Sequence, residues 1–213
     1  MKKIFLVIFS IILFSISFSE TTYKVTTDKS LKLKKEEIAQ NNAQIEAQLA
    51  AFFNPQTYDA DKIKKSVLNL TDAPSKEEDI LINSMSSFIK TYISKSKYNI
   101  EEINYSDAQT AKVTFTTSAP DIKSYLNANE QNIEKQAEKT FKTLSGKTVE
   151  QVDKDTANQD KYVPILMASF ITALSDNIVN IKETNTQKST VEMKKVNGAW
   201  TFDDRLINDL IDF

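Results

Sequence analysis

The segment "KKVNGAWTFDD", residues Lys194 to Asp204, carries the clearest structural signal in the chain. Asn197 and Gly198 are the preferred pair for a two-residue type I′ turn, because both central positions of that turn need a positive φ. Strand-forming residues flank the pair on both sides. The segment therefore predicts an antiparallel β-hairpin, and the fold can be worked outward from it.

The turn also fixes the strand register, since a two-residue loop leaves no slack. The expected pairs are Val196 with Ala199, Lys195 with Trp200, Lys194 with Thr201, and Met193 with Phe202. Opposed residues share a face, so the apolar face holds Val191, Met193, Trp200 and Phe202, and the polar face holds Glu192, Lys194, Thr201 and Asp203. Lys195 is the exception, and we expect its stem over the indole with its ammonium in water. We interpret Trp200 as core; a ligand platform is the alternative.

A second hairpin is predicted upstream. In "TAKVTFTTSAP" the residues Ala111, Val113, Phe115 and Thr117 alternate with polar ones, which is the period of a strand. The preceding "YNIEEINY" is its expected partner. Ile100 and Ile103 have opposite parity, so this strand either starts late or has a bulge near Glu101 and Glu102. Residues 179–185 resemble a weak strand.

Helical periodicity covers most of the remaining chain. The expected helices lie at 31–53, 61–70, 75–93, 121–146 and 162–178, and a polar connector occupies 147–161. Ser75 and Glu78 have the spacing of a capping box, Asp121 is placed to cap the long helix, and Gly146 is placed to end it. The Asn- and Gln-rich stretch from Gln40 to Gln48 is interpreted as an exposed helix surface.

These elements predict an α+β fold, in which a curved antiparallel sheet of about four strands is packed by N-terminal and inserted helices in a cone-like arrangement. Residues 31–213 form one domain in this interpretation. Residues 20–30 are polar and show no helical period, so we expect a flexible lead-in there.

The first 19 residues resemble a secretory leader. Lys2 and Lys3 precede an apolar run from Ile4 to Phe18, and small residues at Ser17 and Ser19 favour cleavage after Ser19. An uncleaved anchor is the alternative, but the run is shorter than the roughly 20 residues that a bilayer requires. The chain has no cysteine to carry a lipid, so we expect a periplasmic or secreted protein without a membrane span.

Composition excludes several chemistries. The 213 residues include no histidine, no cysteine and only two glycines. Ser-His-Asp triads, thiol nucleophiles, Cys/His zinc sites and glycine-rich phosphate loops are therefore absent from the sequence, and we expect no cofactor. Removal of the leader leaves 25 basic and 29 acidic residues, a net charge of −4, with Arg205 the sole arginine. Nucleic acid is not expected as a partner.

Two groups of acidic residues were considered as metal sites. Asp153, Asp155 and Asp160 lie in a stretch that has Asn158 and Pro164 where a calcium-binding EF-hand needs glycine and glutamate. A solvated connector explains them. Asp203 and Asp204 precede a predicted C-terminal helix, where negative charge is favoured without any ligand. We expect no metal site.

The order of elements resembles a known family. The stretches "FFNPQTYDADKIKKSVLNLTD", "AKVTFTTSAPD" and "VEMKKVNGAWTFDD" are similar to bacterial envelope domains of unknown function in the nuclear-transport-factor-two-like (cystatin-like) superfamily. The resemblance covers about Leu31 to Phe213. It implies a bent sheet folded around helices with an apolar pocket. Some superfamily members are isomerases or dehydratases, but none of their catalytic sets maps onto this chain.

Three functions remain open at this stage. The first is non-catalytic binding of a small apolar ligand or a protein partner in the concavity, with the lining candidates Phe88, Tyr92, Phe115 and Trp200. The second is a carboxylate-dependent isomerase or hydrolase-like enzyme, for which Asp107 and Glu102 are the candidate bases. The third is oligomerisation or scaffolding through the helix at 31–53. The sequence does not specify the oligomeric state.

Overall fold

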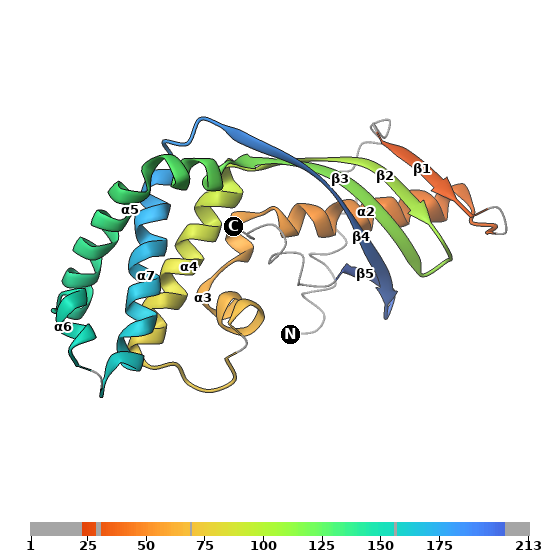
Figure 1. The fold of residues 1–213 in the computed structure, drawn as a ribbon. Coiled ribbons are helices and arrows are strands. Elements are labelled where there is room, and N and C mark those ends of the chain that lie inside the picture. Colours follow the sequence, from red (N-terminus) through yellow and green to blue (C-terminus); the bar gives the residue numbers. More distant parts are fainter. Residues whose placement is uncertain (1–22, 29–30, 69, 156, 203–213) are drawn as a thin grey trace.

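The computed structural model describes residues 23–28, 31–68, 70–155 and 157–202. The predicted leader, residues 1–19, and the predicted C-terminal helix after Phe202 lie outside these ranges. The described chain has an α+β fold with an open, curled sheet, as the sequence predicts (Figure 1). No helix within the described ranges is long and apolar enough to cross a bilayer.

The sheet has five strands in the order β1-β2-β3-β4-β5. Four strands pair antiparallel with one another in chain order: β2 (Lys97–Tyr105), β3 (Thr110–Pro120), β4 (Thr184–Val196) and β5 (Ala199–Phe202). The fifth, β1 (Lys24–Thr27), pairs parallel with β2. The sheet is therefore mixed, and it has five strands where about four antiparallel ones were expected.

The additional strand lies in the segment that was expected to be a flexible lead-in. β1 pairs through its backbone with the outer edge of β2, and Glu102 fastens it: the Lys24 ammonium lies 3.1 Å from the carboxylate, and the Thr26 hydroxyl donates to it over 3.0 Å. Four residues are too few for an alternating pattern to stand out. The partner strand is more than 70 residues away, so no local signal marks β1.

The C-terminal hairpin has the predicted register. All four expected pairs, from Val196–Ala199 to Met193–Phe202, are present. Asn197 has φ 52° and Gly198 has φ 84°, as a type I′ turn requires. The side chain of Lys195 differs from the expectation, since its ammonium donates to Asn41 Oδ1 over 3.0 Å instead of extending into water.

Of the two alternatives for the first hairpin, a late start of the strand or a bulge, the structure has the bulge. The β2–β3 register shifts between Ile100 and Glu102, so two residues of β2 face one of β3. Because of this shift Ile100 and Ile103 both point into the core, with 9% and 0% of their surface exposed.

The helices follow the predicted order with some changes in their ends. Their bounds are α2 (Lys35–Phe52), η1 (Pro55–Thr57), α3 (Ala60–Lys62), η2 (Ile63–Val67), α4 (Lys76–Lys95), α5 (Ile122–Ser145), α6 (Val149–Asp153) and α7 (Gln159–Ile178). The expected helix at 61–70 is one α-turn, α3, followed by the π-helical η2. The polar connector contains α6, α7 begins before Tyr162, and residues 179–183 are not a strand.

The predicted caps are present. Ser75 Oγ accepts from Glu78 N while the Glu78 carboxylate accepts from Ser75 N over 2.7 Å, which completes the capping box of α4. Asp121 accepts from Ser124 N at the start of α5. Gly146 ends that helix in the left-handed conformation, with φ 74°.

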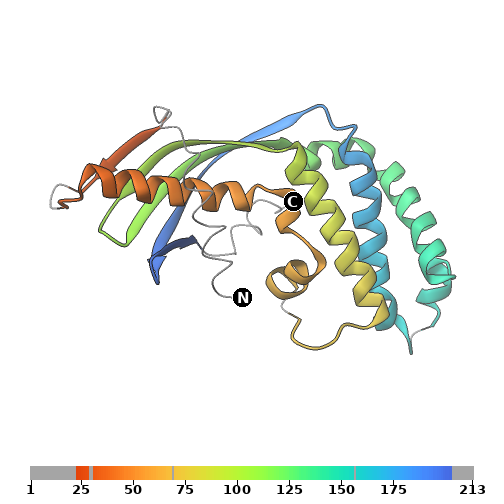
Figure 2. The same cartoon turned by 180° about the vertical axis from the view of Figure 1, so that it is seen from behind.

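Two bodies of helix cover the sheet differently. α2 lies along the inner side of the curled sheet, whereas α4, α5 and α7 stand side by side beyond one end of it (Figures 1 and 2). The main core fills the space between α2, the sheet and the sheet-proximal ends of those helices. A second, small cluster of Phe141, Val152 and Ile165 joins α5, α6 and α7.

Candidate functional site

The four predicted lining residues are spread through the core. Trp200 and Phe115 are fully buried, Phe88 is 4% exposed and Tyr92 is half-buried. Phe88 and Tyr92 stack on each other within α4, with ring centroids 6.2 Å apart. None of the four lines either of the two cavities described below.

Phe115 and Trp200 each contact other aromatic rings. Phe115 meets Phe53 edge to face at 5.9 Å, and Trp200 meets Tyr105 edge to face at 5.8 Å. Phe53 in turn stacks on Tyr98 at 4.4 Å. Protein side chains therefore occupy the positions around both rings, and Trp200 is a core residue as the hairpin pattern predicts.

A polar cluster lies between α2 and the sheet. Asn41 Oδ1 accepts from Trp200 Nε1 over 3.1 Å as well as from the Lys195 ammonium, and Asn42 Oδ1 accepts from the Tyr105 hydroxyl over 2.7 Å. Burial raises the pKa of Tyr105, so this phenol stays a hydrogen-bond donor. The cluster fixes the indole through its only polar atom.

The sequence interpretation missed these two asparagines. They were assigned to an exposed helix surface, yet Asn41 is 1% exposed and Asn42 is 6% exposed. Their spacing contains the missing signal. Ile38 and Ile45 are seven residues apart on one stripe, so a residue near position 41 must occupy the same face.

The two candidate bases lie away from the inner face of the sheet. Asp107 is exposed in the β2–β3 turn, where its carboxylate accepts from Gln109 N over 2.7 Å. Glu102 lies beside β1. Its hydrogen bond with Lys24, and to a smaller extent that with Thr26, holds its pKa below the ordinary range. A carboxylate with a lowered pKa is a weak proton acceptor, so Glu102 does not have the environment of a general base.

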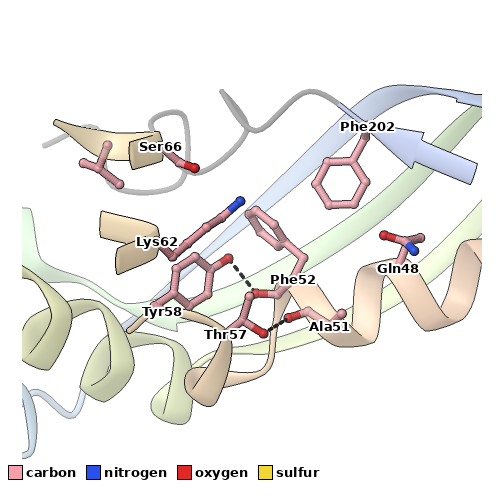
Figure 3. A pocket seen from close by; sticks show the side chains of 9 residues that line it. Gln48, Ala51, Phe52, Thr57, Tyr58, Lys62, Ser66 and Phe202 are labelled. Atoms are coloured by element: carbon pink, nitrogen blue, oxygen red, sulfur yellow. Dashed lines mark hydrogen bonds between the residues drawn. The ribbon is translucent and has the colours of Figure 1, made fainter. Parts of the chain in front are cut away.

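A small cavity opens at the C-terminal end of α2, between η1, η2 and β5. Its volume is about 130 Å³, and its lining comprises Gln48, Ala51, Phe52, Thr57, Tyr58, Lys62, Ser66, Val67 and Phe202 (Figure 3). Phe52 forms the centre of this lining. Its ring meets Phe202 at 5.3 Å and Tyr58 at 6.2 Å, both edge to face.

Backbone contacts hold the wall of this cavity in place. The Tyr58 hydroxyl donates to the Phe52 carbonyl and the Thr57 hydroxyl donates to the Ala51 carbonyl, each over 2.7 Å (Figure 3). Asn54 caps η1 by accepting from Gln56 N. These bonds satisfy the last carbonyls of α2 and turn the chain so that Tyr58 faces Phe52.

A second, open groove of about 410 Å³ lies beside α6. It is lined by Gly146, Lys147, Gln151, Lys154 and Asp155. The Lys147 ammonium bonds Asp155 over 2.9 Å and lies 4.9 Å from the Tyr162 ring centroid, and both contacts raise the pKa of Lys147. Asp155, one of the acidic residues considered for metal binding, thus has a cation as its partner. In the described ranges no three acidic side chains gather as metal ligands would.

The helix proposed for oligomerisation, α2, packs its apolar stripe on its own sheet. Ile45 and Leu49 in this stripe are fully buried. Comparisons of the chain with protein-family models, with curated proteins and with solved structures find no match.

Proposed function

We propose that this protein is an exported, non-catalytic binding domain that accepts a small apolar group in the cavity between Phe52 and Phe202. The observation that supports the proposal is the cavity itself. It is a preformed hollow with Phe52, Tyr58, Val67 and Phe202 in its wall, and it reaches solvent. Preformed apolar hollows with a few polar groups at the edge are the usual form of a small-molecule site.

The volume limits the size of the ligand. A dry apolar cavity of about 150 Å³ binds benzene or xenon, whereas sites for drug-sized molecules span roughly 300 to 1,000 Å³. The cavity of about 130 Å³ matches the first class. The ligand is therefore one aromatic ring, or a branched aliphatic group of similar size, either free or as the end of a longer molecule.

The wall suits an aromatic group in particular. Phe202 and Tyr58 both present themselves edge to face around Phe52, an arrangement that a further ring can extend. Polar side chains, Gln48, Thr57, Lys62 and Ser66, complete the lining. A ligand with an apolar body and a polar end matches that division.

Absent residue types support a role without catalysis. The whole sequence has neither histidine nor cysteine, and the candidate bases Glu102 and Asp107 belong to the sheet edge and a turn. The enzyme alternative retains one feature in its favour. Glu46 is half-buried and accepts a hydrogen bond from the Tyr23 hydroxyl. The pair combines a carboxylate with a tyrosine donor, as a carboxylate-dependent enzyme would require. Neither residue lines a described cavity.

The location and the family are part of the same proposal. The lysines and apolar run of residues 1–19 favour export to the periplasm or the outside of the cell. Membership of the nuclear-transport-factor-two-like superfamily stays a prediction from the element order. A curled sheet around a helix is consistent with that prediction, although a shared fold would not transfer an activity.

A titration with small hydrocarbons tests the proposal. Benzene, indole and cyclohexane are added to the purified chain while the methyl NMR signals of Ala51 and Val67 are followed. We expect saturable shifts at both residues. Ala51→Phe should fill the cavity and abolish the shift at Val67, whereas Ala50→Phe, one residue away on the same helix and also exposed, should keep it. Linear, non-saturating shifts with all three hydrocarbons would contradict the proposal.

A further inference from the structure

Helix α7, which lies between α4 and α5, has an apolar stripe that is about half exposed to solvent. On α7, Val163, Leu166, Met167 and Phe170 are 48%, 45%, 48% and 39% exposed. Their spacing of three and four residues places them on one face. Single exposed apolar residues are common, but four together on two turns of helix mark an interaction surface. We call these four residues the α7 stripe.

Other sides of α7 make its contacts with α4. Lys161 lies 3.4 Å from the Glu77 carboxylate, and the Thr172 hydroxyl donates to Ser84 over 3.3 Å. The earlier α7 residue, Lys161, contacts the earlier α4 residue, and the later one, Thr172, contacts the later one. The two helices therefore run in the same direction. Lys161 and Thr172 lie on the side of α7 opposite the α7 stripe.

In the outer half of α7, Ile165 clusters with Phe141 of α5 from a side other than that of the stripe, whereas Asn177, seven residues after Phe170, contacts α5 from the same side as the stripe. Asn177 donates to Gln136 over 2.8 Å and accepts from the Tyr125 hydroxyl over 3.0 Å. Beyond Phe170 the line of the stripe continues into the core, where Leu174 is 3% exposed and Ile178 is 1% exposed. The stripe is thus the outer continuation of a buried apolar line, and its first two turns stay about half exposed.

We propose that the α7 stripe is the interface of a homodimer, with α7 of one subunit antiparallel to α7 of the other. A two-fold axis between Leu166 and Met167 makes the stripe complementary to itself. It places Val163 against Phe170 of the partner subunit and Leu166 against Met167 of the partner subunit. A small side chain then meets a large one at each end, as close helix packing requires.

The available area is sufficient for a specific dimer. Large apolar side chains offer on the order of 200 Å² each, so four at slightly under half exposure provide roughly 350 Å² per subunit. At the usual apolar share of about 60%, the two subunits together would bury about 1,200 Å². This is the lower end of the range for stable interfaces. We therefore expect a dimer that dissociates on dilution.

The charge pattern favours a second copy over a membrane. From Tyr162 to Ser175 the helix has no charged residue, so the two-fold register brings no like charges of α7 together within this segment. A helix that binds a bilayer surface needs lysine or arginine along the flanks of its apolar face, and this segment has none. A convex helix face also cannot enclose a small ligand.

Sedimentation velocity over about 1 to 200 µM tests the dimer on the purified chain, exported and processed by the cell. We expect the mass to rise from one chain to two across this range. Leu166→Glu should remain a monomer throughout. Val196→Glu makes the same chemical change at an apolar residue that is 53% exposed on the hairpin, and it should dimerise like the original chain. Circular dichroism melting confirms that both variants are folded.

Crosslinking gives an independent measurement, because the chain has no cysteine of its own. Leu166→Cys should form a covalent dimer with a short bis-maleimide at micromolar concentration, and Val196→Cys should not. A monomer at every concentration would overturn the proposal and leave the stripe to a different protein. Equal crosslinking at positions 166 and 196, or a dimer that Leu166→Glu leaves unchanged, would overturn it as well.

Discussion

Replacement of Trp200 by alanine is the most informative perturbation of the core, because the account requires this side chain to be packed on all sides. The indole is fully buried and contacts Tyr105. Truncation of a buried tryptophan costs about 3 to 5 kcal/mol, through lost burial and the cavity that remains. Against a total stability of about 5 to 15 kcal/mol, the loss is a large fraction.

Trp200→Phe separates the ring from the hydrogen bond. Phenylalanine keeps most of the apolar contact but loses the donor to Asn41, whose Oδ1 retains the Lys195 ammonium as a partner. No acceptor is left without a donor, so we expect a cost of about 1 to 2 kcal/mol. Thr201→Ala, next in sequence on the exposed face, is the matched control and should change stability by less than about 0.5 kcal/mol.

The assay is urea unfolding followed by far-ultraviolet circular dichroism, because the substitution removes the only tryptophan fluorophore. A loss of less than about 1 kcal/mol in the free energy of unfolding for Trp200→Ala would show that the indole is not packed in the core. It would mean that the inner face of the sheet is open around the indole, and the ligand-platform interpretation of Trp200 would then replace the core interpretation.

Three further predictions concern local signals. Ser75→Ala should lower the free energy of unfolding by about 1 kcal/mol in urea titrations at neutral pH, since α4 loses its N-cap. Hydrogen bonds from Ser75 lower the pKa of Glu78, so the Glu78 carboxylate stabilises the fold at pH values above its ordinary pKa of 4.5. This contribution is lost as the pH falls through the lower pKa of the folded state. Between pH 5 and 3 the urea midpoint of Glu78→Gln should therefore change less than that of the original chain. Gly198→Ala should lower the melting temperature by a few degrees, because its backbone has φ 84° while the added Cβ would meet no atom within 4 Å. An unchanged cap variant, an unchanged acid profile, or a melting temperature above that of the original chain would contradict the respective prediction.

The sequence predicts those parts of the fold that short segments specify by themselves. The Asn197-Gly198 turn determines four strand pairs, the Ser75 and Glu78 spacing determines a helix start, and the opposite parity of Ile100 and Ile103 reveals a bulge. Each of these depends on backbone geometry within a few residues. The pairing of distant segments has no such marker, which is why β1 was missed.

The candidate site was harder to predict for the same reason. Phe52 and Tyr58 are close in sequence, but Phe202 reaches them from the far end of the chain, and only the β5 register brings it there. Aromatic composition alone favours the largest residues on the sheet, Phe115 and Trp200, which are used for the core. Periodicity predicts the apolar positions Val163, Leu166 and Phe170 of α7, but it does not tell which turns of a helix are covered.

The inner face of the sheet is filled by side chains, and the open apolar space lies at the end of α2. Xenon binding in crystals is the most direct measurement of this arrangement. Xenon occupies apolar cavities of this size without any specific polar contact. We expect a xenon atom between Phe52, Tyr58 and Phe202. Xenon beside Phe115 or Trp200, with none at Phe52, would contradict it.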